Sequence, residues 1–293
     1  MTQTSREPGG PAPASTVLVL RDRGGVVEVF MVRRHQGTAF MGGAFVFPGG
    51  RVDPSDISDA DDTWCDGLPG AATNLPDLPN ADAVGHHVAA ARELFEEAGV
   101  LVARDGAGRF VSLADAAAHR RFKRSRHDVH GGVRAFRDVV RQDGLRLALD
   151  AFVPWAHWVT PPVDVRQFDT RFFVTRVPPD QVPAHDEAET TESVWTSASA
   201  ALDRCRRDEI VLPPPTWTTL RELEPFATVE AAIGWARTRT IRRWQPKAVE
   251  EGGSRMLLLP GDPLNPEAAA GPPPLETRFV LVNGRWRAGR PRT

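Results

Sequence analysis

The chain has 293 residues, a formal net charge of −2, and 41% hydrophobic and 25% charged residues, as in many globular proteins. It is long enough for one large domain or for one domain with an extension. The nearly balanced charge favours neither nucleic acid nor an acidic membrane as a partner. Its two cysteines, Cys65 and Cys205, have no Cys or His neighbours at metal-ligand spacing. This argues against a disulfide scaffold or a zinc site and favours a reducing, cytoplasmic environment.

Residues 1–13 are rich in proline and glycine, so a disordered tail is expected there. This segment lacks the apolar core of a secretory signal. No apolar run in the chain approaches the roughly 18 residues that span a bilayer, and no membrane association is expected.

β-Branched residues indicate the first strands. They are frequent in residues 16–20 and 26–32, and the turn-forming RDRGG between them predicts a hairpin. Residues 43–47 (GAFVF) predict a third short strand, which the following Pro-Gly-Gly ends. Residues 57–83 differ, because they are rich in Asp, Pro, Gly and Asn and show no period. A surface loop or mobile excursion, dispensable for folding, is expected there.

Helical periodicity returns at residues 84–98, and Gly99 fits the position that ends a helix. Residues 113–142 are expected to be mostly helical, in one or two pieces. Strands and helices then alternate, with strands expected at 155–160, 171–177 and 193–196, and helices at 198–207 and after the prolines at 213–215.

The domain formed by residues 14–225 is expected to carry a C-terminal extension, residues 226–293. The extension contains a predicted helix at 229–239 and apolar runs at 256–259 and 278–282. Because such runs need burial, we expect the extension to pack on the domain.

Three carboxylates share one face of the helix expected at 84–98. Glu93, Glu96 and Glu97 stand at positions i, i+3 and i+4, where like charges repel by a few tenths of a kcal/mol per pair. They also lie near the end of the helix, where its dipole disfavours negative charge. The pattern fits either a solvated acidic face or a site whose carboxylate oxygens bind a hard cation.

The surrounding residues favour the cation site. Phe47-Pro48-Gly49-Gly50, followed later by RELFEEAGV, resembles the Nudix box of Nudix hydrolases. Gly50 aligns with the first glycine of that box. The resemblance implies that Gly49 and Gly50 allow the loop to approach the metal and the substrate closely. The last seven fixed positions are matched by Arg92, Glu93, Leu94, Glu96, Glu97, Gly99 and Val100.

The resemblance implies an α/β (α+β) fold, the Nudix αβα sandwich, in which a mixed β-sheet lies between helices. It also implies that Glu93, Glu96 and Glu97 bind Mg²⁺ or Mn²⁺ and that Arg92 orients them by charge-assisted hydrogen bonds. The implied reaction is the metal-dependent hydrolysis of a phosphoanhydride bond in a nucleoside diphosphate derivative, a small-molecule substrate.

Two features depart from the box. Its early Glu position holds the shorter Asp56, at a place that is mainly structural in the family. Asp56 and Arg92 are separated by 35 residues, where the box has seven. The excess falls in residues 57–83, and an insertion whose ends stay close costs little closure entropy. A Nudix subgroup that includes the peroxisomal coenzyme A diphosphatase of animals carries a long insertion here, and its box is similar to RELFEEAGVLV.

Coenzyme A or an acyl-coenzyme A is therefore the leading candidate substrate. The signature of coenzyme A-cleaving Nudix enzymes has an Arg and a His before FPGG, and these places hold Ala39 and Met41. Arg33 and Arg34, just upstream, are candidate substrate-binding residues instead, because Arg suits bidentate phosphate binding. The alternative for them is an ordinary basic strand end. The alternatives for the whole chain are an ADP-ribose- or NADH-type diphosphatase and a non-catalytic nucleotide-sensing module.

Glu189 is a further candidate, as a metal ligand or general base, with Glu187 and Glu192 as weaker candidates and a solvated acidic turn as the alternative. Arg166 and Arg171 lie on either side of Asp169 in the sequence, and one of them is expected to pair with it. The basic run at 120–126 is read as a solvated helix face rather than a nucleic-acid site. A homodimer is a candidate assembly.

Overall fold

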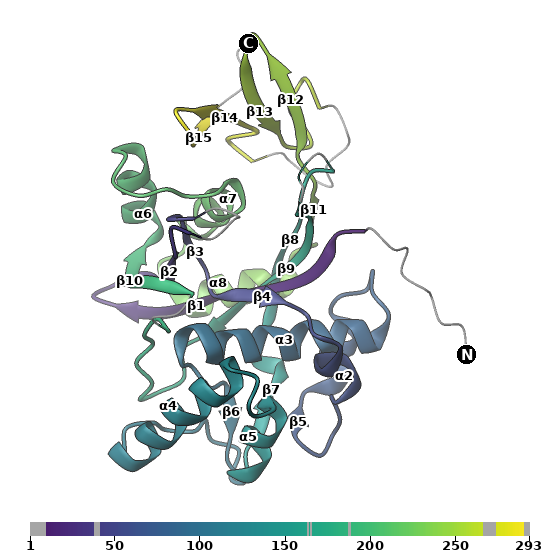
Figure 1. Ribbon diagram of the computed structural model, residues 1–293, viewed down its shortest axis with the longest axis vertical. Coiled ribbons are helices and arrows are strands. Elements are labelled where there is room, and N and C mark those ends of the chain that lie inside the picture. Colours follow the sequence, from purple (N-terminus) through teal and green to yellow (C-terminus); the bar gives the residue numbers. More distant parts are fainter. Residues whose placement is uncertain are drawn as a thin grey trace.

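The computed structural model describes residues 10–37, 42–162, 164, 166–186, 189–265 and 274–289. Within these residues the largest sheet has its strands in the order β10-β2-β1-β9-β8-β11, with β3 paired to β2 and β4 to β1 (Figure 1). The β1–β9 and β8–β11 pairs are parallel and the others are antiparallel, so the sheet is mixed, as expected. Its strands are β1 (Ala12–Arg23), β2 (Val26–Arg34), β3 (Phe45–Val46), β4 (Gly49–Arg51), β8 (Val153–Val159), β9 (Phe168–Arg176), β10 (Thr190–Ser197) and β11 (Arg243–Trp244).

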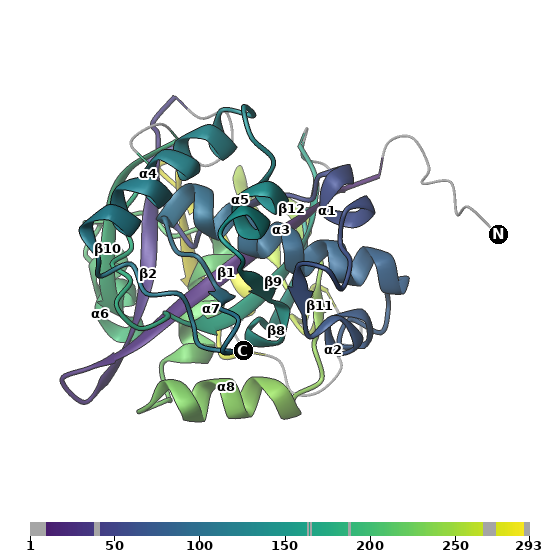
Figure 2. The ribbon, with the colours of Figure 1, turned by 90° about the horizontal axis from the view of Figure 1, so that it is seen from below.

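Helices cover both faces of this sheet, which confirms the expected αβα sandwich. Side chains alternate along β1, so Val17 and Val19 pack in the core beneath α3, whereas Leu18 and Leu20 pack in the core beneath α6, α7 and α8. Figure 2 shows α8 on the opposite side of the molecule from α4. The helices are α1 (Pro54–Ser58), α2 (Leu68–Thr73), α3 (Asn80–Ala98), α4 (Ala116–His130), α5 (Phe136–Gln142), α6 (Ala198–Arg206), α7 (Pro214–Leu223) and α8 (Val229–Thr238).

Most predicted elements are present. The hairpin turns at Gly24 and Gly25, both at positive φ, which favours glycine. Residues 113–142 form two helices, α4 and α5. The disordered tail predicted for residues 1–13 is wrong at its end, because β1 begins at Ala12 and its first residues pair with the start of β9. Residues 1–9 lie outside the described residues.

The loop predicted for residues 57–83 is wrong. This segment contains the end of α1, the strand β5 (Cys65–Asp66), the helix α2 and the start of α3. Trp64, Cys65, Ala71 and Leu75 are buried in the core beneath α3. β5 joins a small sheet in the order β5-β7-β6, with β6 (Ala103–Arg104), β7 (Arg146–Ala148) and a 3₁₀ turn (Leu149–Ala151) beside it. The insertion is therefore folded and packs against the core beneath α3.

The C-terminal residues contribute to the main sheet and form another one. Helix α8 packs on the main sheet through Val229, Ala232 and Ile233, and β11 extends that sheet at β8. The remaining strands form a sheet in the order β12-β13-β14-β15, which Figure 1 shows above β8 and β11. The boundary between residues 225 and 226 stays a prediction. The strands are β12 (Lys247–Glu251), β13 (Ser254–Leu258), β14 (Arg278–Val282) and β15 (Arg285–Gly289).

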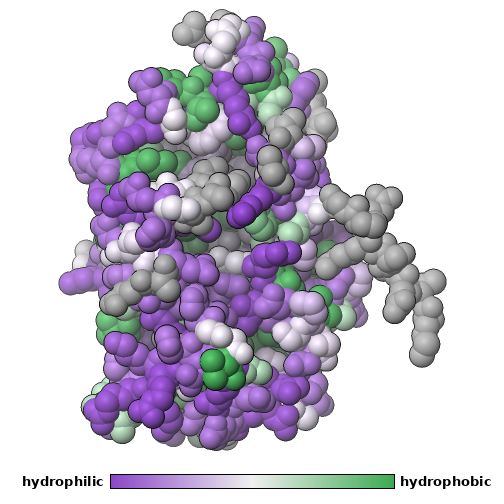
Figure 3. Space-filling model, viewed as in Figure 1, coloured by the Kyte–Doolittle hydropathy of each residue, from purple (hydrophilic) through white to green (hydrophobic). Residues whose placement is uncertain are grey.

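The surface visible in Figure 3 is mostly hydrophilic, above all at the end formed by α4 and α5. On α4, Phe122, Ser125 and Val129 are buried while most of the basic residues are exposed, so the basic run is a solvated helix face. Among the described residues, none of the helices has the length and apolar character needed to cross a membrane.

Candidate active site

The acidic face of α3 borders a cleft of about 490 Å³. Glu93, Glu96 and Glu97 all line this cleft, so the helix presents its three carboxylates together, as their spacing predicts. The helix ends at Gly99, whose φ of 67° is left-handed. Arg126 of α4 donates from Nε to the carbonyl oxygen of Glu96 at 2.7 Å and so binds a carbonyl near the helix end.

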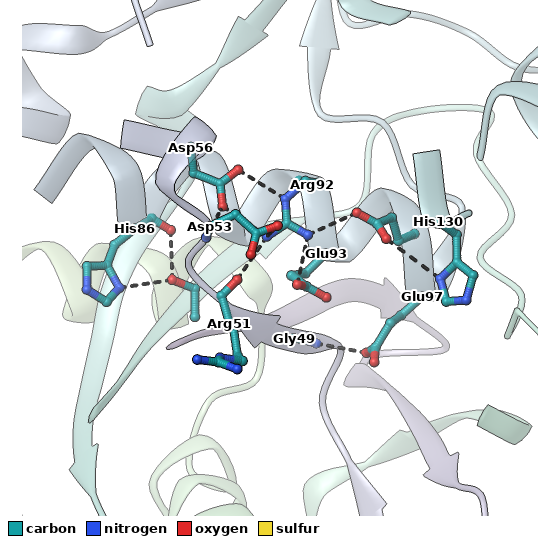
Figure 4. A network of polar contacts seen from close by, with 11 residues as sticks. Gly49, Arg51, Asp53, Asp56, His86, Arg92, Glu93, Glu97 and His130 are labelled. Atoms are coloured by element: carbon teal, nitrogen blue, oxygen red, sulfur yellow. Dashed lines mark hydrogen bonds and ion pairs between the residues drawn. The ribbon is translucent and has the colours of Figure 1, made fainter. Parts of the chain in front are cut away.

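Arg92 lies at the centre of a polar network (Figure 4). Its guanidinium donates to both carboxylate oxygens of Asp56, at 3.0 and 2.9 Å, and to Glu93 and Glu96, at 2.9 and 3.0 Å. It also donates to the carbonyl oxygen of Arg51 at 2.8 Å. Asp56, although shorter than the Glu of the box, therefore reaches Arg92 with two hydrogen bonds. It reaches because α1 begins beside β4 and holds Asp56 in a capping box with Asp53.

The two glycines of β4 permit a close approach. A Cβ atom on Gly50 would lie 2.6 Å from the carboxylate of Glu93, and one on Gly49 would lie 2.3 Å from the carbonyl oxygen of Ser15. The backbone N–H of Gly49 donates to Glu97 at 2.8 Å. A side chain at position 49 would therefore collide with the backbone of β1, and one at position 50 would displace the carboxylate of Glu93.

The electrostatics show an excess of negative charge at this face. Burial raises the pKa of Glu93 to about 7, against the opposing effect of Arg92. Burial, and next the charge of Glu93, raise the pKa of Glu97 well above its ordinary value. Although burial disfavours the charged guanidinium, its hydrogen bond to Asp56 and the charges of Glu93 and Asp56 raise the pKa of Arg92 above its usual range. One arginine thus does not balance the cluster.

The donor set fits a divalent metal ion. Carboxylate oxygens are the preferred ligands of hard cations, and the raised pKa values of Glu93 and Glu97 mean that another positive charge would be stabilising here. Within the described ranges, no three acidic, His or Cys side chains already converge at metal-ligand geometry. In Figure 4, Glu93 is turned toward Arg92 and Glu97 toward Gly49. The carboxylate of Glu96 also accepts a hydrogen bond from Arg92, at 3.0 Å.

The structure brings most of the other predicted site residues to the same cleft. Gly49, Gly50, Arg34 and Glu189 line it. Arg33 does not, because neighbouring residues of a strand point to opposite faces. Its guanidinium instead lies 3.4 Å from Glu192.

Glu189 lies near the box glutamates although it is far from them in sequence. Its carbonyl oxygen accepts a hydrogen bond from the backbone N–H of His35 at 2.9 Å, which ties this segment to the end of β2. Its charge is among the influences that raise the pKa of Glu97. Glu187, Ala39 and Met41 lie outside the described residues.

Sequence reasoning missed two features near the site. His130, at the end of α4, lines the cleft, and its Nδ1 lies 3.6 Å from the carboxylate of Glu96. Asp77, within the insertion, accepts two hydrogen bonds from the buried Arg171, at 2.9 and 2.6 Å. Arg171 also pairs with Asp169 at 3.6 Å, as expected. No local pattern could have revealed contacts between residues so distant in sequence.

Comparisons with known proteins agree with this geometry. The model of the NUDT19 Nudix domain family matches residues 70–223, which is more than half of the chain. The human acyl-coenzyme A diphosphatase NUDT19 is 32% identical, over 89% of this chain and 76% of its own length. The protein of the same name from Xenopus laevis is 26% identical, over 82% of this chain and 72% of its own length.

A solved structure shares the fold. A Nudix hydrolase from Alicyclobacillus acidocaldarius superposes with a TM-score of 0.62 at 28% identity, covering 76% of this chain and 96% of that one. With the Nudix box residues assembled around one cleft, these similarities establish that the chain belongs to the Nudix hydrolase family, in the branch of the NUDT19 Nudix domain.

Proposed function

We propose that this enzyme hydrolyses the diphosphate bond of coenzyme A or of an acyl-coenzyme A. The observation that carries the proposal is the similarity to acyl-coenzyme A diphosphatases over most of the chain, together with a cleft that contains the three box glutamates and Arg34. The products expected are 3′,5′-ADP and 4′-phosphopantetheine, or its acyl derivative.

Glu93, Glu96 and Glu97 would hold the divalent metal ion, with Mg²⁺ or Mn²⁺ as the expected ions. When bound, the metal supplies charge stabilisation for phosphoryl oxygens and lowers the pKa of a bound water. Arg92 holds Glu93 and Glu96 in place from behind the cleft. Glu189 is proposed to accept the proton of the attacking water or to contribute a further ligand.

The reaction needs few covalent events. The oxygen of a water molecule forms a bond to one phosphorus, and the bond between that phosphorus and the bridging oxygen breaks. The bridging oxygen leaves with the other phosphate, and the proton lost by the water passes to a base. The protein therefore contributes to catalysis mainly by positioning the reacting groups and by stabilising charge.

Arg34 is the proposed phosphate-binding residue. It lines the cleft, and its buried Nε has no hydrogen-bond partner among the described residues, so a donor is available there. Replacing Arg34 by Ala should raise KM for coenzyme A more than it lowers kcat, since the contact exists before the reaction begins. Arg33→Ala is the matched control, because Arg33 points away from the cleft, and it should change KM less than twofold. Equal effects of the two variants would remove Arg34 from the site.

The substrate assignment is tested by a direct comparison. Purified protein is incubated with coenzyme A, octanoyl-coenzyme A, ADP-ribose, NADH, diadenosine polyphosphates and nucleoside triphosphates, each with Mg²⁺ and with Mn²⁺. We expect release of 3′,5′-ADP from the coenzyme A compounds. Cleavage of ADP-ribose or NADH alone would favour the other class of diphosphatase. Nucleotide binding without any cleavage would favour a sensing module.

We also propose a compartment and an assembly. Both cysteines are free and buried, which agrees with a cytoplasmic location. A homodimer remains a candidate, and light scattering of the purified protein would give the mass that decides it.

A further inference from the structure

The cleft has two walls of different chemistry. The glutamates of α3 form one wall, and residues of β8, β9 and β13 and the prolines at the start of α7 form the other. In Figure 1, α3 lies below the main sheet, and β12 and β13 lie above it. The second wall is largely apolar, and several of its residues are prolines, which have no backbone N–H to donate. A few polar side chains lie among them, those of Thr160, Asp164, Arg166 and Thr216. The apolar residues are Trp158, Val159, Pro161, Phe172, Pro213, Pro214, Pro215, Pro246 and Leu257.

The C-terminal sheet is fixed where it completes this wall. Leu257 of β13 is 6% exposed and belongs to the core that α7 and α8 share with the main sheet. Arg255, two residues earlier, donates to Asp164 at 2.7 Å, and Asp164 lies in the loop that borders the cleft. Arg285 of β15 pairs with Asp208 at 3.1 Å, after α6. The C-terminal sheet that carries Leu257 is therefore tied to the loop beside the cleft through Asp164 and to the segment after α6 through Asp208.

This wall suits an uncharged, flexible group. The adenosine half of coenzyme A carries a charged phosphate and a base with many polar atoms, which need more partners than the few polar side chains of this wall supply. Asp164 is already engaged by Arg255, which leaves the exposed Arg166 as the charged side chain of the lining nearest to it in sequence. The pantetheine arm is uncharged but has amides and a hydroxyl, whereas the acyl chain is wholly apolar, and burial of each of its methylenes would increase affinity roughly fourfold.

We infer that the C-terminal sheet, through Leu257, binds the acyl-pantetheine arm of the substrate and makes the enzyme prefer acyl-coenzyme A to free coenzyme A. The inference rests on the proposed function, and it gives the C-terminal residues a role in substrate selection. In this orientation the diphosphate lies at the glutamates, and the acyl chain extends along β13.

The test measures kcat/KM for free coenzyme A, butanoyl-coenzyme A and octanoyl-coenzyme A. For the wild type, kcat/KM should rise about tenfold or more from free coenzyme A to the octanoyl ester. Leu257→Asn should lower the value for octanoyl-coenzyme A about tenfold more than the value for free coenzyme A, which has the pantetheine arm but no acyl chain, whereas Leu257→Met should keep the wild-type preference. Leu281→Asn, in β14 and away from the cleft lining, is the control in the same sheet.

A binding measurement separates the possible failures. S-octanoylpantetheine, which has no phosphate, should bind the wild type in calorimetry without metal and should bind Leu257→Asn at least tenfold more weakly. Equal kcat/KM for free and acylated coenzyme A, equal losses on both in Leu257→Asn, or no binding of S-octanoylpantetheine to the wild type would each overturn the inference while the diphosphatase function stands. Equal losses would instead mean that this wall contacts a part of coenzyme A that both substrates share, and not the acyl chain. If the wild type cleaves no coenzyme A compound, the proposed function fails and the inference with it.

Discussion

Arg92 compensates Glu93 and Glu96 by direct hydrogen bonds, whereas Glu97 accepts a hydrogen bond from the backbone N–H of Gly49 and is stabilised from a greater distance by the charge of Arg34. Glu97 is also the most buried of the three, at 6% exposed, and burial raises its pKa well above the ordinary value. A carboxylate in this position is stabilised most when a metal ion is present. Its chemistry, more than its packing, therefore explains why a glutamate stands here.

The variant Glu97→Gln keeps the shape of the side chain and can still accept a hydrogen bond from Gly49. We expect kcat to fall at least about a hundredfold, because a metal or base contribution is lost, while the unfolding temperature hardly changes. Steady-state kinetics and calorimetric melting of the purified variant measure the two effects. Near-normal turnover on the correct substrate would contradict the assignment of Glu97.

Gly50 is constrained by the site and not by its own backbone angle. In Gly50→Ala the new Cβ would lie 2.6 Å from the Glu93 carboxylate, so that side chain must move. We expect the concentration of Mg²⁺ needed for half-maximal activity to rise at least about tenfold, since a ligand is displaced. Gly234→Ala is the control, because nothing lies within 4 Å of a Cβ there. An unchanged metal requirement in Gly50→Ala would show that Glu93 is not a ligand.

At the scale of elements, periodic segments were predictable and short packed ones were not. The hairpin, α3 and α6 each repeat an apolar pattern over several residues, and all three are present as predicted. The insertion has no such repeat, because its short pieces bury single residues such as Trp64 and Leu75. The box likewise identified the glutamates, whereas the approach of His130 and of Leu257 to the cleft depends on tertiary packing.

The insertion is expected to be necessary for stability, contrary to its composition. Trp64 is 1% exposed, donates from Nε1 to the carbonyl oxygen of Asp59 at 2.8 Å, and packs edge-on against Phe136. Trp64→Ala should therefore lower the free energy of unfolding by about 3–5 kcal/mol. Chemical denaturation measures this, with the exposed Asp62→Asn as the control. A loss below about 1 kcal/mol would restore the view of a dispensable loop.

For the whole molecule, the interface between α3 and the main sheet contains polar groups that must stay neutral. His86 and His87 lie on α3, and burial lowers their pKa values to about 3 and about 4. His86 contacts Ser15 of β1 at 3.1 Å, and His87 packs against Phe173 of β9. Protonation of either ring would place a charge inside the sandwich, so the stability of the folded protein depends on pH.

The direction of this pH dependence follows from the pKa that each ring has in the folded protein and in the unfolded protein. The unfolded histidines titrate near 6.5, above their folded pKa values, so below pH 6.5 the unfolded state binds more protons and stability falls as pH falls toward 4. Glu93, whose pKa is raised to about 7, acts in the opposite direction between about pH 4.5 and 7, and the raised pKa of Glu97 acts in the same direction as that of Glu93. The difference in the free energy of unfolding between the wild type and His87→Gln isolates the effect of one ring. This difference should decrease by about 1.4 kcal/mol per pH unit as the pH falls below about 6.5, and it should stay constant above that pH. Urea titrations between about pH 4.5 and 8 measure it. A difference independent of pH would mean that His87 has the same pKa in the folded and the unfolded protein, as an exposed ring has.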